Sequence, residues 1–331
     1  MKKFLTAALM LGAASAAQAA AILDNGTIMI GVGDYGQLNV SGGPSSPVEG
    51  TTAVGLRDLR TGYEATSHGC QCEGWGVSVN GLSGGANNST DGSPFGALSL
   101  SSFSFGGTGT SPFSAGSNAT SVTTLGGALR ITHTFTPSVN SNLFQVNVNI
   151  ENISGEATTN LLYRRAFDWD IEPTAFNEYS TIQGTALAAN VILANDNGFC
   201  SSNPLAGCSG SFSGDFIDAG PTDHGAVFGF DFGALAAGGS YSFNIYYGAA
   251  PTEAAALSSL GAVGGQIYSF GQASNDRTGG NGSTFIFGFD GVGGVVVNPG
   301  VPEPGIWAQL IVGFGLAGVA ARRRRRATVA A

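Results

Sequence analysis

Basic residues are almost absent from the middle of this 331-residue chain. Lysine occurs only at Lys2 and Lys3, and five of the arginines form one cluster near the C-terminus. Residues 20–300 keep six arginines against 21 of the 22 acidic residues, which gives a formal charge of −15. A body of that sign repels the phosphates of nucleic acids and of anionic membranes, so both are excluded as its partners.

Histidine is equally sparse, and long apolar runs occur only at the two ends. His68, His133 and His224 form no i, i+4 pair and therefore no helical zinc motif. Glycine is abundant instead, with 53 residues, and 43% of the chain is apolar, including 21 phenylalanines. This composition predicts a chain that turns often, has few long helices and still buries a sizeable core.

Residues 1–19 have the pattern of a secretory signal peptide. Lys2 and Lys3 precede a short apolar stretch, and Ala17-Gln18-Ala19 supplies the small residues that signal peptidase accepts. The apolar stretch is shorter than the roughly 20 residues of a membrane span. We therefore expect export through the Sec machinery and cleavage after Ala19, rather than a permanent anchor.

The C-terminal segment, residues 301–331, combines three elements in a fixed order. Val301-Pro302-Glu303-Pro304 comes first, an apolar run covers 306–321, and a basic cluster follows, consisting of Arg322, Arg323, Arg324, Arg325 and Arg326. A helix over 306–321 would rise about 24 Å, close to the ~30 Å hydrocarbon core of a bilayer. Trp307 would lie at the outer interface and the arginines in the cytoplasm, so this helix is expected to cross the membrane below an exported body.

This order of elements resembles the PEP-CTERM sorting signal, which a membrane protease called exosortase recognises. The residues that carry the match are Val301 to Pro304, Trp307-Ala308, the apolar segment 310–315 and the arginine cluster. The resemblance implies a Gram-negative host, transient anchoring in the inner membrane and cleavage near the motif. Release to the cell surface or to the extracellular polysaccharide matrix would follow. A permanent single-pass anchor is the alternative.

Alternation of apolar and polar residues dominates the body, residues 20–300. It is clearest in 129–135, 143–150, 241–247 and 285–289, and turns rich in Gly, Asn, Ser or Pro separate these runs. One short helix is expected to begin after Thr252 as N-cap and to end at Gly264-Gly265. The pattern predicts an all-β fold, an antiparallel β-sandwich with one short helix, in one large domain rather than two.

Four cysteines in an exported protein are expected to form disulfides. Cys200 and Cys208 bracket a short loop and are the favoured pair. Cys70 and Cys72 are two residues apart, so on a strand they would point the same way and a bridge between them would be strained. A redox or metal-binding pair is the alternative for Cys70 and Cys72.

The acidic stretch Asp168-Trp169-Asp170-Ile171-Glu172 is the main candidate site. On a strand the three carboxylates share one face and repel one another unless a cation or an arginine lies among them. Calcium accepts six to eight oxygen ligands, and Asp196 could add one. The stretch therefore predicts either a calcium site formed by Asp168, Asp170, Glu172 and Asp196, or an acidic strand that is exposed or paired with Arg164 and Arg165.

Two functions from different classes remain open. The favoured one is a non-enzymatic protein of the cell surface or matrix, processed by exosortase and associated with exopolysaccharide or biofilm. The alternative is a secreted carbohydrate-active enzyme that uses two carboxylates among 168–172, since a glycosidase needs such a pair on either side of a sugar. The segments 55–62, 72–76 and 163–179 also resemble domains that accompany this sorting signal and have no assigned activity.

Overall fold

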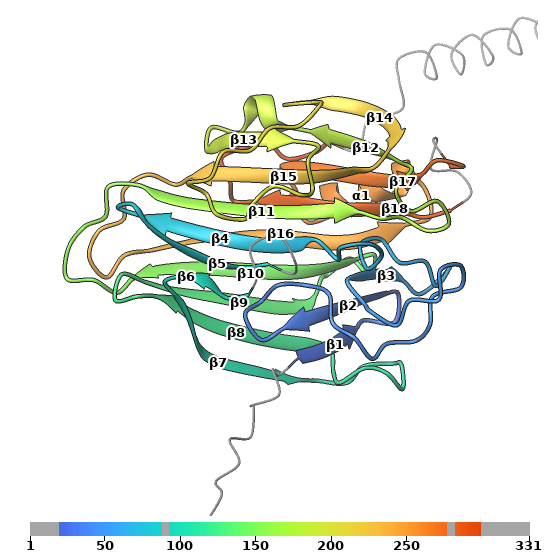
Figure 1. Cartoon of the computed structure of the whole chain (residues 1–331), viewed down its shortest axis with the longest axis horizontal. Coiled ribbons are helices and arrows are strands. Elements are labelled where there is room, and N and C mark those ends of the chain that lie inside the picture. Colours follow the sequence, from blue (N-terminus) through green and yellow to red (C-terminus); the bar gives the residue numbers. More distant parts are fainter. Residues whose placement is uncertain (1–19, 88–92, 277–281, 299–331) are drawn as a thin grey trace, which may run out of the picture.

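Antiparallel strands make up most of the computed structural model, which describes residues 20–87, 93–276 and 282–298 (Figure 1). The expected signal peptide and the expected membrane helix over 306–321 lie outside these residues. Strand β1 begins at Ala20, directly after the expected cleavage site. No helix among the described residues has the length and apolar character needed to cross a membrane.

The largest sheet has nine strands in the order β14-β12-β17-β18-β16-β10-β9-β8-β7. In that order the strands cover Phe216–Thr222, Glu178–Gln183, Ile267–Ala273, Thr284–Asp290, Ser240–Ala250, Leu143–Asn152, Leu129–Pro137, Asn118–Leu125 and Leu98–Gly106. All pairings within the sheet are antiparallel.

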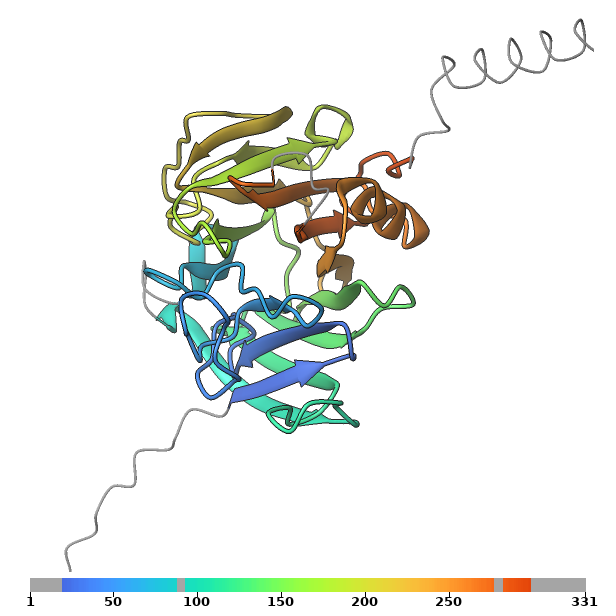
Figure 2. The ribbon, with the colours of Figure 1, turned by 90° about the vertical axis from the view of Figure 1, so that its right-hand side faces the viewer.

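A second sheet has six strands in the order β13-β15-β11-β4-β5-β6. They cover Val191–Asn195, His224–Asp231, Leu161–Trp169, Glu73–Val79, Leu82–Asn87 and Phe95–Gly96. The N-terminal strands β1 (Ala20–Asp24), β2 (Ile28–Gly33) and β3 (Leu56–Asp58) form a small third sheet. In Figure 2 this sheet, in blue, lies across the green strands of the nine-stranded sheet.

The core lies between the two large sheets, as in a sandwich. Aromatic rings from opposite sheets touch, with centroids 5.2 Å apart for Phe167 and Phe287 and 5.0 Å apart for Tyr163 and Phe243. Strand β10 shows the predicted alternation, with Val146 and Val148 fully buried and Asn147 between them half-buried. The predicted all-β class is confirmed, and alternation succeeds here because one face of the sheet is buried and the other is not.

The one α-helix of the described residues is also where the sequence predicts it. Helix α1 spans Glu253–Ala262, and the side chain of its N-cap Thr252 accepts a hydrogen bond from the Ala255 N–H. Leu260 is buried against the outer side of β16 and β18. A 3₁₀ turn, η1, covers Thr185–Leu187.

The four cysteines form two disulfides. The predicted Cys200–Cys208 pair is confirmed. Cys70 and Cys72 are also bonded to each other, so they are not metal-binding thiolates in this structure, whereas a redox role for the pair is compatible with a disulfide and stays a prediction. The expectation of strain assumed a strand, whereas these residues lie in a turn in which Gln71 adopts a left-handed φ of 56° that brings the two side chains together.

From β11 to β15 the chain alternates between the two large sheets, and two of these crossings meet at one end of the sandwich. It leaves the six-stranded sheet at Trp169 and enters the nine-stranded sheet at Glu178. After β13 in the six-stranded sheet and β14 in the nine-stranded sheet, it leaves β14 at Thr222 and re-enters the six-stranded sheet at His224, with only Asp223 between. This corner of the sandwich contains the candidate site.

Candidate functional site

Three aspartates meet at the corner. Asp168 is the penultimate residue of β11, and Asp170 follows the end of that strand. The ladder between β11 and β15 pairs Trp169 with His224, so Asp170 and Asp223 stand opposite each other one step beyond the last pair. One oxygen from each of Asp168, Asp170 and Asp223 lies within 4.8 Å of the other two.

The inner carboxylates of this group lack hydrogen-bond partners. Asp168 is 1% exposed and Asp170 0%, and neither oxygen of Asp170 nor Oδ1 of Asp168 has a hydrogen-bond partner in the structure. Glu178 is also buried and leaves its Oε2 unpartnered, while its Oε1 accepts a hydrogen bond of 2.8 Å from the His224 N–H. Buried charges without partners are unfavourable, so this arrangement requires compensation.

The same burial raises the pKa values of these carboxyls. Desolvation, reinforced by the charge of Asp223, raises the pKa of Asp170 to about 7. Desolvation raises the pKa of Glu178 to about 9, although the hydrogen bond from the His224 N–H acts to lower it. The pKa of Asp168 lies well above its usual range for the same reason, with the charge of Asp170 adding to the effect. Several of these groups therefore hold protons at neutral pH when no cation is bound.

Glu172, the third acid of the predicted set, is directed to other partners. Its Oε1 accepts hydrogen bonds from the Ser46 hydroxyl at 2.6 Å and the Glu49 N–H at 2.8 Å, and its Oε2 accepts one from the Glu64 N–H at 3.1 Å. The Nε2 of His68 lies 3.5 Å from Oε1. Although desolvation acts to raise it, these contacts lower the pKa of Glu172 to about 2. Glu172 is thus a satisfied structural carboxylate outside the aspartate group.

Asp196 is close to the corner but engaged with a histidine. Its Oδ2 lies 2.9 Å from Nδ1 of His224, and its Oδ1 accepts a hydrogen bond from the Phe212 N–H. Desolvation lowers the pKa of His224 despite this contact, so the imidazole is neutral at pH 7. The structure therefore does not place Asp196 in the aspartate group where the sequence analysis expected it.

The two arginines that were the expected counter-charges are also used elsewhere. Arg164 donates hydrogen bonds to the carbonyls of Ser201, Pro204 and Ala206. Arg165 is fully buried and forms an ion pair with Glu73, with Nε 2.6 Å from Oε1. The prediction of an exposed or arginine-paired acidic strand is wrong, because Asp168, Asp170 and Glu172 are buried and these arginines face other groups.

Comparison with known proteins adds no family to this picture. No protein-family model and no curated protein matches the chain. The chemistry of the site therefore rests on its own geometry.

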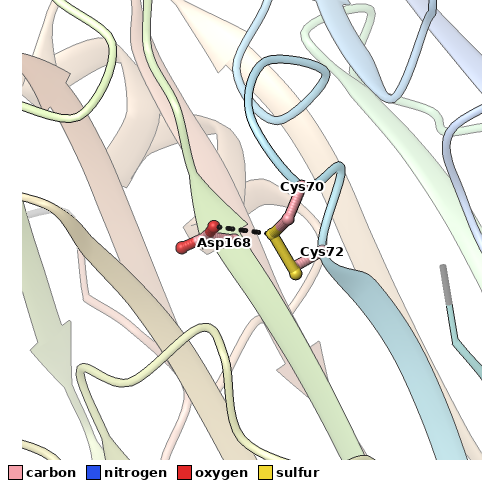
Figure 3. A group of neighbouring side chains, drawn as sticks. All are labelled: Cys70, Cys72 and Asp168. Carbon is pink, nitrogen blue, oxygen red and sulfur yellow. Dashed lines mark hydrogen bonds between the residues drawn. A yellow bond between two sulfur atoms is a disulfide. The ribbon is translucent and has the colours of Figure 1, made fainter. Parts of the chain in front are cut away.

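The Cys70–Cys72 disulfide borders the aspartate group. Sγ of Cys70 lies 3.6 Å from Oδ2 of Asp168 (Figure 3). Because this sulfur is bonded to Cys72, it carries no hydrogen and cannot donate to the carboxylate in the oxidised protein. The disulfide closes one side of the site without neutralising its charge.

A cavity opens on the other side of the corner. It has a volume of about 320 Å³, and its lining includes Asp223, His224, Asp196 and Ser209. Asp223 is exposed, whereas Asp168 and Asp170 lie behind it. The group therefore has one solvent-accessible member, Asp223, which lines this cavity.

Sequence reasoning missed Asp223 and Glu178. Both are far from 168–172 along the chain, and neither belongs to a recognisable motif. Neither acid adjoins one of the strands predicted from alternation, so no signal in the sequence marked it. Knowing which turns meet requires the strand order, which the sequence does not reveal.

Proposed function

We propose that this protein is an exported component of the bacterial cell surface or extracellular matrix that acts by binding and not by catalysis. The resemblance of residues 301–331 to an exosortase substrate supports processing by signal peptidase and exosortase, with transient residence in the inner membrane. The pairing of all four cysteines supports an oxidising compartment, because cytosolic thiols are kept reduced.

The burial of the candidate acids carries the non-catalytic part of the proposal. A glycosidase needs two carboxyls on either side of a sugar ring in an accessible cleft. Asp168, Asp170 and Glu172 are each at most 1% exposed, so a sugar cannot be seated between any two of them. The rival proposal of a carbohydrate-active enzyme at 168–172 lacks the access that its chemistry needs.

The outer face of the nine-stranded sheet favours a carbohydrate partner. Thr134 of β9, Asn147 of β10 and Asn244 of β16 form one row across three strands. Thr132, Asn149 and Ser242 form the next row. We call these six residues the amide-hydroxyl face.

Hydrogen bonds within this face hold its side chains in place. Asn147 donates to Oδ1 of Asn244 at 3.0 Å, and Asn149 donates to the Ser242 hydroxyl at 2.7 Å. The six residues are uncharged and present donors and acceptors at strand spacing, and Asn244 also donates to the carboxylate of Asp290 on the next strand. Such a surface suits the hydroxyls of an exopolysaccharide chain, which carry no charge of their own.

The test of this proposal has two parts, both with protein from its native host. The intact mass is expected to begin near Ala20 and to end near Pro304. A mass that retains Arg322 to Arg326 would instead identify a permanent membrane protein and contradict release to the matrix.

Co-sedimentation with the host exopolysaccharide tests the binding part. Binding without turnover is expected, and the double variant Thr134→Ala/Asn147→Ala should weaken it while Glu156→Gln, at an exposed position elsewhere, should not. Turnover that disappears in Asp170→Asn would overturn the non-catalytic assignment in favour of the enzyme.

A further inference from the structure

We infer that Asp168, Asp170 and Asp223 form a binding site for a divalent cation of the calcium class. This goes beyond the proposed surface function and does not depend on it. One oxygen from each aspartate lies within 4.8 Å of the other two, a spacing that lets a single ion contact all three at once.

The need for a cation follows from the unpartnered oxygens. Asp170 is completely buried, and neither of its carboxylate oxygens accepts a hydrogen bond. Glu178 is also buried, its Oε2 has no hydrogen-bond partner, and its charge acts on Asp168. Native proteins do not keep several buried carboxylates without compensation.

Side chains of the protein do not provide this compensation among the described residues. Arg57, Arg60, Arg130 and Arg165 pair with other acids, and Arg164 binds backbone carbonyls. Among the described residues, His68 is the one basic side chain whose charge acts on Asp170, and its Nε2 lies 3.5 Å from Oε1 of Glu172. Among the described residues no side-chain cation is left to pair with the aspartates, so their charge is compensated either by protons or by an external ion.

The donor atoms select a hard cation. All three aspartates offer oxygen, and the neighbouring sulfurs are tied up in the Cys70–Cys72 disulfide and are not thiolates. Nδ1 of His224 contacts Asp196, and its unpartnered Nε2 is not among the ligand atoms that lie within 4.8 Å of one another. Oxygen donors without thiolate or imidazole favour calcium, magnesium or manganese over zinc and copper.

Calcium fits this corner better than magnesium. Magnesium requires near-ideal octahedral geometry, whereas calcium accepts six to eight oxygens in an irregular arrangement. The ligands here come from a strand end, a following turn and a one-residue crossover, which have no common symmetry. Because Asp223 is exposed at the 320 Å³ cavity, water can complete the coordination shell and the ion has a path inward.

The ion would connect the two large sheets. Asp168 belongs to the six-stranded sheet, and Asp223 is the crossover from the nine-stranded sheet back to it. Glu178, the first residue of β12 in the nine-stranded sheet, lies behind them. A bound ion would therefore fasten one end of the sandwich.

Isothermal titration of the chelator-treated full-length protein with calcium chloride tests the site, together with thermal unfolding. One calcium ion per chain and a rise in Tm on calcium addition are expected. The exposed member gives the cleanest variant: Asp223→Asn should weaken calcium binding at least tenfold and reduce the Tm rise. The control Glu156→Gln removes one exposed acid far from the corner and should behave as the wild type.

Two results would overturn the inference. One is the absence of saturable calcium binding by wild-type protein whose circular dichroism shows it to be folded. The other is an unchanged affinity in both Asp223→Asn and Asp170→Asn, which would place any ion elsewhere. Magnesium binding with equal or higher affinity would overturn the calcium assignment. None of these measurements involves export or polysaccharide, so failure here leaves the proposed function to its own tests.

Discussion

Replacing Asp170 with asparagine is expected to stabilise the protein at alkaline pH when divalent cations are chelated. Asp170 is fully buried, and its two oxygens accept no hydrogen bonds, although its backbone N–H is bonded to the Ala65 carbonyl. Asparagine has nearly the same shape and no charge. The substitution therefore removes the unfavourable feature and keeps the packing.

The size of the effect follows from the pKa of Asp170, which burial raises from 3.8 to about 7. Between these values the folded protein holds the proton more tightly than the unfolded chain does, so stability falls as the pH rises. At 1.36 kcal/mol per pKa unit the loss between pH 4 and pH 8 is roughly 4 kcal/mol. Burying the asparagine amide costs about 1–3 kcal/mol, which leaves a net gain of about 2 kcal/mol near pH 8.

Urea unfolding in EDTA, followed by the fluorescence of the buried Trp75 and Trp169, measures this gain. Near pH 4 the wild-type carboxyl is largely protonated, so Asp170→Asn is expected to give no gain there. With saturating calcium near pH 8 the wild type should be more stable than Asp170→Asn, because the variant lacks one calcium ligand. The reasoning is refuted if Asp170→Asn in EDTA lowers stability near pH 8 as much as it does near pH 4.

Two further predictions concern stability away from the aspartates. Arg165→Met should destabilise the fold by about 3–5 kcal/mol because it leaves the buried Glu73 carboxylate uncompensated. The double variant Arg165→Met/Glu73→Gln should lose less unfolding free energy than the two single variants lose together. If urea unfolding showed the two losses to be additive, a direct pairing of Arg165 and Glu73 would be contradicted. Cys200→Ser, compared with the wild type under non-reducing conditions, should lose roughly 2–3 kcal/mol through the freed loop. Equal stability of the two proteins would show that this disulfide does not constrain the unfolded chain.

Local features of the fold could be predicted because their causes are local. The alternation in β10 follows from one buried sheet face, and α1 begins at Thr252 because its hydroxyl caps the first turn. The Cys200–Cys208 disulfide closes a short loop, so few alternatives compete with it. Each of these depends on residues that are close together in the sequence.

The site could be predicted only in part because it depends on strand order. Asp168 and Asp170 are marked by their neighbours in sequence, but Asp223 reaches them through the register between β11 and β15. Glu172 was grouped with them by spacing alone. The structure instead gives it hydrogen bonds from Ser46, Glu49 and Glu64, which lie in a segment more than a hundred residues earlier.

The position of the corner also divides the chain into parts that can open separately. Residues 170–223 form an excursion that begins and ends at the aspartates and contains β12, η1, β13, β14 and the Cys200–Cys208 disulfide, with β13 paired to β15 in the six-stranded sheet. A cation held by Asp168, Asp170 and Asp223 would act as a reversible cross-link between the beginning and the end of this segment. In the calcium-free protein, amide hydrogens of this excursion should exchange together and faster than those of β9 and β10. The calcium content of the surroundings would then set how often this part of the protein opens to proteases, and so how long the exported protein survives.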